Sequence, residues 1–401
     1  MLLRRFLLLV SLVFCVGAGY ARELPSNVRS QIDAMINRGL NNKAFPGASF
    51  LVGDRNGIIY EKYYGGHDYS GQAPVTTEDI YDIASCTKIL STTFVTMKLY
   101  DEGKIRLGQK IGDLVPQVKN TRISDITVQE LMTHTSGIPP QVFHHEIAKN
   151  PLYFCTEDSG DYRRIGTGLY INPAVDTMIL NRVCKGYVPA NRGKYNYNDS
   201  NFYLMRLAVE NITGKPLEVL TAELFDQLDC RNTGYNPLEW KSLEHIMPTE
   251  IDIYLRKCLV QGYVHDEFAA VLGGIGGHAG LFSNVRDMSC FCEMMLNDGE
   301  FRGKRILSRE TVRIFTASPL SSKGVYRGIG FDKRSAAGSK LGGDDLFGHT
   351  GFTGCIFWED RAKGFYMIFL SNSVYTTRNN TQLNDSGLRT NIWALLEGAA
   401  F

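Results

Sequence analysis

The sequence has almost no net charge, because its 43 basic residues stand against 42 acidic ones. It also has no run of lysine or arginine. A balance of this kind gives no electrostatic support for binding nucleic acid or for a basic membrane-surface patch. After residue 21 no apolar run approaches the length that spans a bilayer, so we predict no transmembrane span in the mature chain.

The first 21 residues differ from the rest. A short basic segment, residues 1–5, precedes the apolar stretch 6–17, and small residues follow at Gly19 and Ala21. This order is typical of a secretory signal peptide, cut here after Ala21. We therefore predict an exported protein, periplasmic or secreted. A retained membrane anchor and a lipoprotein attached through Cys15 are the weaker alternatives.

Cysteine spacing indicates neither a disulfide framework nor a zinc site. An even number of cysteines in an exported chain permits disulfides, but a domain of this size does not need them. Cys290 and Cys292 are too close for an easy bridge and lack partners at zinc-like spacing. We expect most of these thiols to be buried, and the pairing of Cys155 with Cys184 is the one to test. The cysteines of the mature chain are Cys86, Cys155, Cys184, Cys230, Cys258, Cys290, Cys292 and Cys355.

Strand patterns lie at both ends of the chain, with helical patterns between them. Residues 48–52 and 58–64 flank Asn56-Gly57, a step that favours a hairpin turn. Residues 355–358 and 365–370 form a second hairpin. These patterns predict an α/β (α+β) protein in which both chain ends meet in one antiparallel sheet. Helical spacing predicts helices over residues 26–40, 202–212, 217–228 and 388–399.

The predicted organisation is a single catalytic domain, residues 22–401, with two lobes. The sheet lobe covers about 22–109 and 263–401, the helical lobe covers about 110–262, and the active-site cleft lies between them. Within the helical lobe, residues 141–192 look like a set of irregular loops whose role the sequence does not show. No repeat or linker indicates a second domain.

The stretch Ile83-Ala84-Ser85-Cys86-Thr87-Lys88 carries the first candidate chemistry. The apolar positions that follow predict an amphipathic helix whose first turn holds both Ser85 and Lys88. Serine is a weak nucleophile at its free pKa, and a desolvated lysine is neutral enough to act as its base. The helix N-terminus also supplies backbone N–H groups where an oxyanion would form. Because Ser-x-x-Lys is common by chance, this hypothesis needs support from elsewhere in the chain.

Two later motifs give that support. Tyr197-Asn198-Asp199 precedes the helix predicted over 202–212, on a turn from which a phenol can project into the cleft. His349-Thr350-Gly351 precedes the last hairpin, where the glycine lets a substrate approach the backbone. Each motif alone is an ordinary turn. Their order and separation relative to Ser85, however, are distinctive.

With these motifs the chain resembles the serine β-lactamase and penicillin-binding-protein superfamily, in particular the group of class C β-lactamases, D-Ala-D-Ala carboxypeptidases and related esterases. The resemblance covers nearly the whole mature chain and implies the β-lactamase fold. Its matching segments are Pro46-Gly47-Ala48, residues 81–88, residues 131–137, Tyr197-Asn198-Asp199, residues 277–283 and Gly348-His349-Thr350-Gly351.

The resemblance also implies an acyl-enzyme mechanism. Ser85 would attack a carbonyl while Lys88 and Tyr197 exchange protons as base and acid. The backbone N–H groups of Ser85 and Phe352 would form the oxyanion hole, and water would then release the acyl group. The substrate-binding residues that it implies are Asp199, His349, Thr350 and Gly351.

Two positions depart from the family pattern. Asp199 stands where many relatives carry asparagine, so a possible donor becomes an acceptor and a possible partner for Lys88. His349 stands where class C β-lactamases carry lysine, which removes a fixed cation for a substrate carboxylate. We therefore expect slow β-lactam hydrolysis, with D-amino-acid peptides of peptidoglycan type as the first substrate class and small esters as the second. A non-catalytic envelope protein that binds penicillin or muropeptides is the alternative from another class; the presence of Ser85, Lys88 and Tyr197 together argues against it.

The remaining candidate residues receive structural interpretations. Cys86 points away from Ser85 around the helix and is expected to pack in the core. His134 is expected to cap or brace the helical lobe. His265 and His278 lack the His-x-x-x-His spacing that a helix would need to hold a metal, so we predict no metal and no cofactor.

Overall fold

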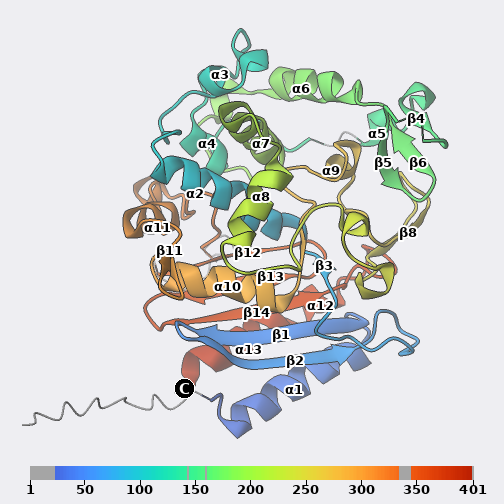
Figure 1. The fold of residues 1–401 in the computed structure, drawn as a ribbon, viewed down its shortest axis with the longest axis vertical. Helices are drawn as coiled ribbons and strands as arrows, with labels where there is room; N and C mark the ends of the chain where they lie inside the picture. The colour runs from blue at the N-terminus through green and yellow to red at the C-terminus, as the bar shows by residue number, and fades with distance from the viewer. Residues whose placement is uncertain (1–22, 142–143, 159, 334–344, 400–401) are drawn as a thin grey trace, which may run out of the picture.

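The computed structural model describes residues 23–141, 144–158, 160–333 and 345–399. The signal peptide and Cys15 lie outside these residues. The largest sheet has five antiparallel strands in the order β12-β13-β14-β1-β2 (Figure 1). These strands are β1 (Gly47–Asp54), β2 (Gly57–Gly65), β12 (Leu346–Thr350), β13 (Ile356–Asp360) and β14 (Phe365–Ser371).

Strands from the two ends of the chain pair directly in this sheet. β1 runs antiparallel to β14 with Ala48 opposite Ser371, and it also pairs with β2 as the predicted hairpin. The predicted final hairpin is β13 and β14. The sequence did not reveal β12 as a third strand beyond this hairpin, and it is the strand that carries His349.

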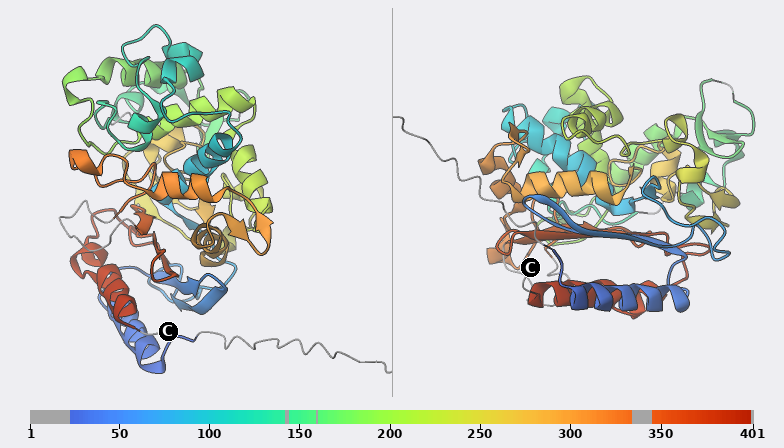
Figure 2. Two further views of the ribbon diagram at one scale, coloured as in Figure 1. Left: turned by 90° about the vertical axis from the view of Figure 1, so that its left-hand side faces the viewer. Right: turned by 60° about the horizontal axis from the view of Figure 1, so that its bottom comes forward.

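Helices cover both faces of the sheet. Helices α1 (Ser26–Asn41) and α13 (Leu388–Gly398) lie side by side on one face, and α10 (Val285–Leu296) lies on the other (Figure 2). Along β1, Phe50 and Val52 pack toward α1 and α13, whereas Leu51 points into the larger core on the opposite face. This alternation is the period of two that a strand between two buried layers requires.

A mostly helical lobe stands on the α10 side of the sheet (Figure 1). Its helix α7 spans the predicted segment and ends at Gly214, which adopts a left-handed conformation (φ 67°). The helices of this side are α2 (Phe94–Asp101), α3 (Ile111–Leu114), α4 (Val128–Met132), α7 (Ser200–Thr213), α8 (Leu217–Asp226), α9 (Glu267–Val271) and α11 (Arg309–Thr316).

The interpretation of residues 141–192 as irregular loops is wrong. Helix α6 spans Val175–Gly186 and buries one face through Val175, Ile179 and Val183. A small sheet lies beside it, and its strands have only two to four residues, too short to leave an alternating pattern in the sequence. The short elements are α5 (His144–Ile147), β4 (Phe154–Cys155), β5 (Arg163–Gly166), β6 (Leu169–Ile171), β7 (Glu250–Asp252) and β8 (Cys258–Val260).

The eight cysteines of the described chain are free thiols. The pairing of Cys155 with Cys184 is not formed, since the Cys155 Sγ donates to the carbonyl oxygen of Glu157 at 3.0 Å. Cys86 is fully buried, as expected for a packing residue. Among the helices of the described residues, none has the length and apolar character needed to cross a membrane.

Candidate active site

Ser85 lies in a tight turn that leads from strand β3 (Tyr81–Asp82) into a buried helix. The backbone forms a 3₁₀ turn over Ala84–Cys86, a π-helical segment over Lys88–Thr93 and then α2. Residues 86–97 are all buried because α7 and α8 pack against this segment. The prediction of an amphipathic helix is therefore wrong, although the spacing argument for Ser85 and Lys88 holds.

Lys88 reaches Ser85 across this turn. Its Nζ lies 2.8 Å from the Ser85 Oγ. Ser85 is half-buried and lines a cavity, whereas Lys88 is completely buried. A serine hydroxyl that faces a cavity and contacts an amine from behind has the geometry of an activated nucleophile.

The environment of Lys88 favours its charged form. Its Nζ lies 2.7 Å from Asp199 Oδ1 and donates to the carbonyl oxygen of His278 at 3.3 Å. Burial lowers the pKa of Lys88, but Asp199 and the Tyr197 phenol outweigh this effect, and the net pKa is raised above its ordinary value of 10.5. The resting site therefore holds an ammonium and not the neutral amine predicted from the sequence.

Tyr197 lies over Lys88 just ahead of α7. Its phenol is within hydrogen-bonding reach of the Ser85 and Lys88 side chains, and the Lys88 Nζ is 4.9 Å from the ring centroid. Burial raises the pKa of Tyr197 even though the Lys88 ammonium lowers it, so the phenol is protonated at rest. The ring of His134 packs against the Tyr197 ring, with centroids 4.4 Å apart and planes tilted by 39°. His134 therefore supports this tyrosine directly, which the sequence did not indicate.

Asp199 lies beside Lys88, the partner of the nucleophile. Its carboxylate pairs with Lys88, and Asp199 is not among the residues that line the cavity at Ser85. This contact confirms the suggestion that Asp199 partners Lys88. The role of Asp199 in substrate binding stays a prediction.

The cavity beside Ser85 has a volume of about 520 Å³. His349, Thr350 and Gly351, at the end of β12, form one wall together with Phe352. The Phe352 side chain is 62% exposed, so an apolar ring borders the opening. Gly351 passes close to the nucleophile turn, because a Cβ at this position would lie 2.5 Å from the carbonyl oxygen of Ile83.

Arg327 places a guanidinium beside His349, and its Nη1 pairs with Asp332 Oδ2 at 3.4 Å. Its Nη2 lies 3.4 Å from His349 Nε2, and both residues line the cavity. Burial, followed by the charges of Arg327 and Lys88, lowers the pKa of His349 to about 3, so this histidine is neutral at physiological pH. The expectation of slow β-lactam turnover stays a prediction. Nothing in the spacing of Arg327 relative to His349 revealed this contact.

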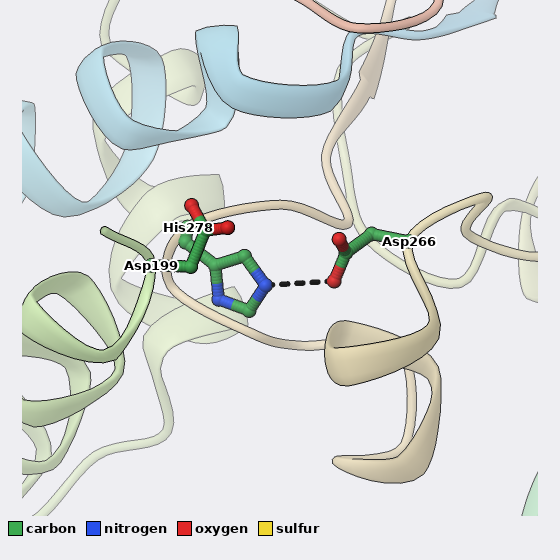
Figure 3. A group of neighbouring side chains, drawn as sticks. All are labelled: Asp199, Asp266 and His278. Carbon is green, nitrogen blue, oxygen red and sulfur yellow. Dashed lines mark hydrogen bonds and ion pairs between the residues drawn. The ribbon is translucent and has the colours of Figure 1, made fainter. Parts of the chain in front are cut away.

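His278 and Asp266 form a second pair of polar side chains near Asp199 (Figure 3). His278 contacts Asp266 Oδ1 through Nε2 at 2.7 Å and faces the carbonyl oxygen of Gly276 through Nδ1 at 3.1 Å. Asp199, Asp266 and His278 offer ligand atoms within 4.8 Å of one another, which is close enough for a metal ion. Lys88 already neutralises Asp199, however, and the imidazole of His278 is engaged by Asp266. Lys88 and Asp266 are therefore the charged partners of this cluster.

Comparison with known proteins agrees with this geometry. The family model described as Beta-lactamase matches residues 32–391, which is most of the chain. The chain belongs to the beta-lactamase family. The resemblance and the fold inferred from the sequence motifs are thereby confirmed.

Two similar proteins have names that state an activity. The chain is 29% identical over 379 residues to the N-acetylmuramyl-L-alanine amidase of Bacillus subtilis (strain 168), covering 86% of this chain and 81% of the relative. It is also 29% identical over 392 residues to a putative D-alanyl-D-alanine carboxypeptidase of Escherichia coli (strain K12), covering 88% and 84%.

Solved structures of the beta-lactamase fold are similar over nearly the whole chain. The octameric penicillin-binding protein homologue from Pyrococcus abyssi gives a TM-score of 0.63 at 20% identity, covering 90% of this chain and 77% of that one. EstCE1, a hydrolase with promiscuous acyltransferase activity, gives 0.63 at 14% identity, covering 90% and 98%. At these identities the likeness concerns the fold alone.

Proposed function

We propose that this member of the beta-lactamase family is an exported serine hydrolase that works through an acyl-serine intermediate. The contact of 2.8 Å between Lys88 Nζ and Ser85 Oγ, at the wall of an open cavity, is the observation that carries the proposal. Export rests on the signal peptide predicted from residues 1–21 and fits the cell-wall substrates named for the relatives.

In the proposed reaction, Ser85 Oγ attacks the substrate carbonyl and its proton passes to Lys88. Since Lys88 is an ammonium at rest, only the small fraction with a neutral amine can accept this proton. Tyr197, with its protonated phenol in reach of Ser85, then donates to the leaving group as general acid. Water releases the acyl group by the reverse order of transfers.

The cavity wall supplies the other requirements. The backbone N–H groups of Ser85 and Phe352 are assigned to the oxyanion hole. Thr350 and Gly351 orient the substrate along β12. Arg327 is the side chain assigned to a substrate carboxylate, because its guanidinium lines the cavity beside His349, where it shares its charge with Asp332 at 3.4 Å.

We assign D-amino-acid peptides of peptidoglycan type, or related cell-wall amides, as the substrate class. A terminal carboxylate on such a peptide matches the Arg327 guanidinium, and the names of both curated relatives describe amide or peptide hydrolysis in cell-wall material. A small ester is the second candidate, favoured by the exposed Phe352 ring at the cavity opening. A non-catalytic binding protein is the third.

One comparison separates these candidates. The ratio kcat/KM is measured for a D-Ala-D-Ala peptide, a muramyl-L-alanine amide, p-nitrophenyl acetate and a cephalosporin, with Ser85→Ala as the control. The proposal expects the peptide or the muramyl amide to be the best substrate and Ser85→Ala to be inactive. Preference for the ester would favour the esterase. Saturable binding of all four compounds without turnover would favour the binding protein.

A further inference from the structure

Asp82 is a buried carboxylate outside the groups already assigned to the reaction. It is 1% exposed and lies at the end of β3, three residues before Ser85. Its two oxygens accept hydrogen bonds from two backbone N–H groups that are far apart in sequence, Ala84 N at 2.8 Å and His265 N at 2.6 Å. A buried carboxylate that accepts only from the backbone fixes the position of the chain around it.

The first of these bonds holds the nucleophile turn. Ala84 has φ 46°, a left-handed conformation that is unfavourable for a residue with a Cβ atom. The bond from Ala84 N to Asp82 Oδ1 compensates this conformation. Because Ala84 is bonded directly to Ser85, its conformation sets where the Ser85 Oγ and backbone N–H point.

The second part of the oxyanion hole is tied to the same residue. Thr353 Oγ1 donates to the carbonyl oxygen of Asp82 at 2.7 Å, and Thr353 directly follows Phe352. The Phe352 ring stacks on the ring of His265 with centroids 5.6 Å apart, and the backbone N–H of that histidine is the one held by Asp82 Oδ2. The segment with Phe352 is therefore anchored to Asp82 at two points. One is the Thr353 hydroxyl, and the other is the Phe352 ring, which stacks on His265.

We propose that Asp82 is a positioning residue that sets the spacing between the two oxyanion-hole donors, the backbone N–H groups of Ser85 and Phe352. The inference rests on the proposed acyl-serine function. Asp82 does not line the cavity, so it does not contact the substrate. Its effect on the transition state would act through the positions of the two backbone donors. Asparagine cannot replace it, because an amide accepts through one atom only and would turn an N–H₂ group toward the other donor.

The test compares Asp82→Asn with a matched control. Asp287 on α10 is also a buried carboxylate that accepts a backbone N–H, from Asn232 at 2.7 Å, but it does not contact the nucleophile turn. We expect Asp82→Asn to lower kcat/KM for p-nitrophenyl acetate by about 10²–10³, the loss typical of one misplaced oxyanion donor, with KM nearly unchanged. The affinity for phenylboronic acid, which forms a tetrahedral adduct on serine, falls in parallel. Asp287→Asn leaves both quantities unchanged.

A double variant tests whether Asp82 acts through the backbone conformation of Ala84. Glycine adopts a positive φ without penalty, so adding Ala84→Gly to Asp82→Asn should recover about tenfold of the lost rate. If Asp82→Asn does not fold, the test uses Thr353→Val and Thr353→Ser instead. The valine variant should lose activity, and the serine variant should keep it.

The inference is overturned if folded Asp82→Asn retains the wild-type kcat and boronate affinity, if its loss lies in KM alone, or if Asp287→Asn loses as much. It is equally overturned if Thr353→Val and Thr353→Ser behave alike. Failure of the proposed function has a different signature, because the wild-type protein would then show no turnover that depends on Ser85.

Discussion

Replacing Asp199 with asparagine tests how the nucleophile is activated. The substitution keeps the size of the side chain and removes the charge that lies 2.7 Å from Lys88 Nζ. An opposite charge at such a distance changes a pKa by roughly 1–3 units. Since the pKa of Lys88 is raised above 10.5, its neutral fraction at a pH of about 7.5 is below roughly one in a thousand. Asp199→Asn should therefore increase this fraction, and the rate of acylation, about 10- to 1,000-fold near neutral pH.

The assay is the dependence of kcat/KM on pH for p-nitrophenyl acetate, between about pH 6 and 11. A base whose pKa is raised must lose its proton before it works, so wild-type activity should increase with pH through the neutral range. In Asp199→Asn this rising limb moves to lower pH. Asp199→Glu keeps the charge and should follow the wild-type profile. A lower rate for Asp199→Asn at every pH would refute the reasoning and would indicate that Asp199 itself accepts a proton.

Three further predictions concern the cavity. Tyr197→Phe should lose about 10²–10⁴ in kcat, while Tyr195→Phe, a change in a neighbouring lining residue, should have little effect; equal losses would remove the general-acid role. Arg327→Gln should raise KM for a D-Ala-D-Ala peptide about 10- to 100-fold and leave p-nitrophenyl acetate unaffected, and a matching loss on both substrates would contradict a carboxylate site. Because the pKa of His349 is lowered to about 3, His349→Ala should not alter the shape of the pH profile near 6.5, where a free histidine titrates; the disappearance of a step there would contradict the neutral His349.

The sequence predicted the parts of this site that depend on local spacing. Ser85 and Lys88 are three residues apart, so any helical turn brings their side chains together, and the structure places them 2.8 Å apart. The sheet strands next to the chain ends were also predicted, because each is a short apolar run bounded by turn residues, and the structure buries every residue of β1 and β14. Such local patterns do not depend on how the rest of the chain folds.

Contacts between distant segments could not be predicted in this way. Arg327 meets His349 only because the turn at Gly330 and strand β12 fold against each other, and no spacing in the sequence encodes that distance. The charge of Lys88 depends likewise on Asp199, which lies more than a hundred residues away in the chain. A tertiary contact therefore reversed a pKa that burial alone would have lowered.

The central claim is that Ser85 forms a covalent acyl intermediate, and intact mass after incubation with benzylpenicillin or p-nitrophenyl acetate tests it most directly. The wild-type protein should gain one penicilloyl or one acetyl group per chain, and Ser85→Ala should gain neither. A wild-type protein without an adduct from either reagent, or an equal adduct on Ser85→Ala, would contradict the account.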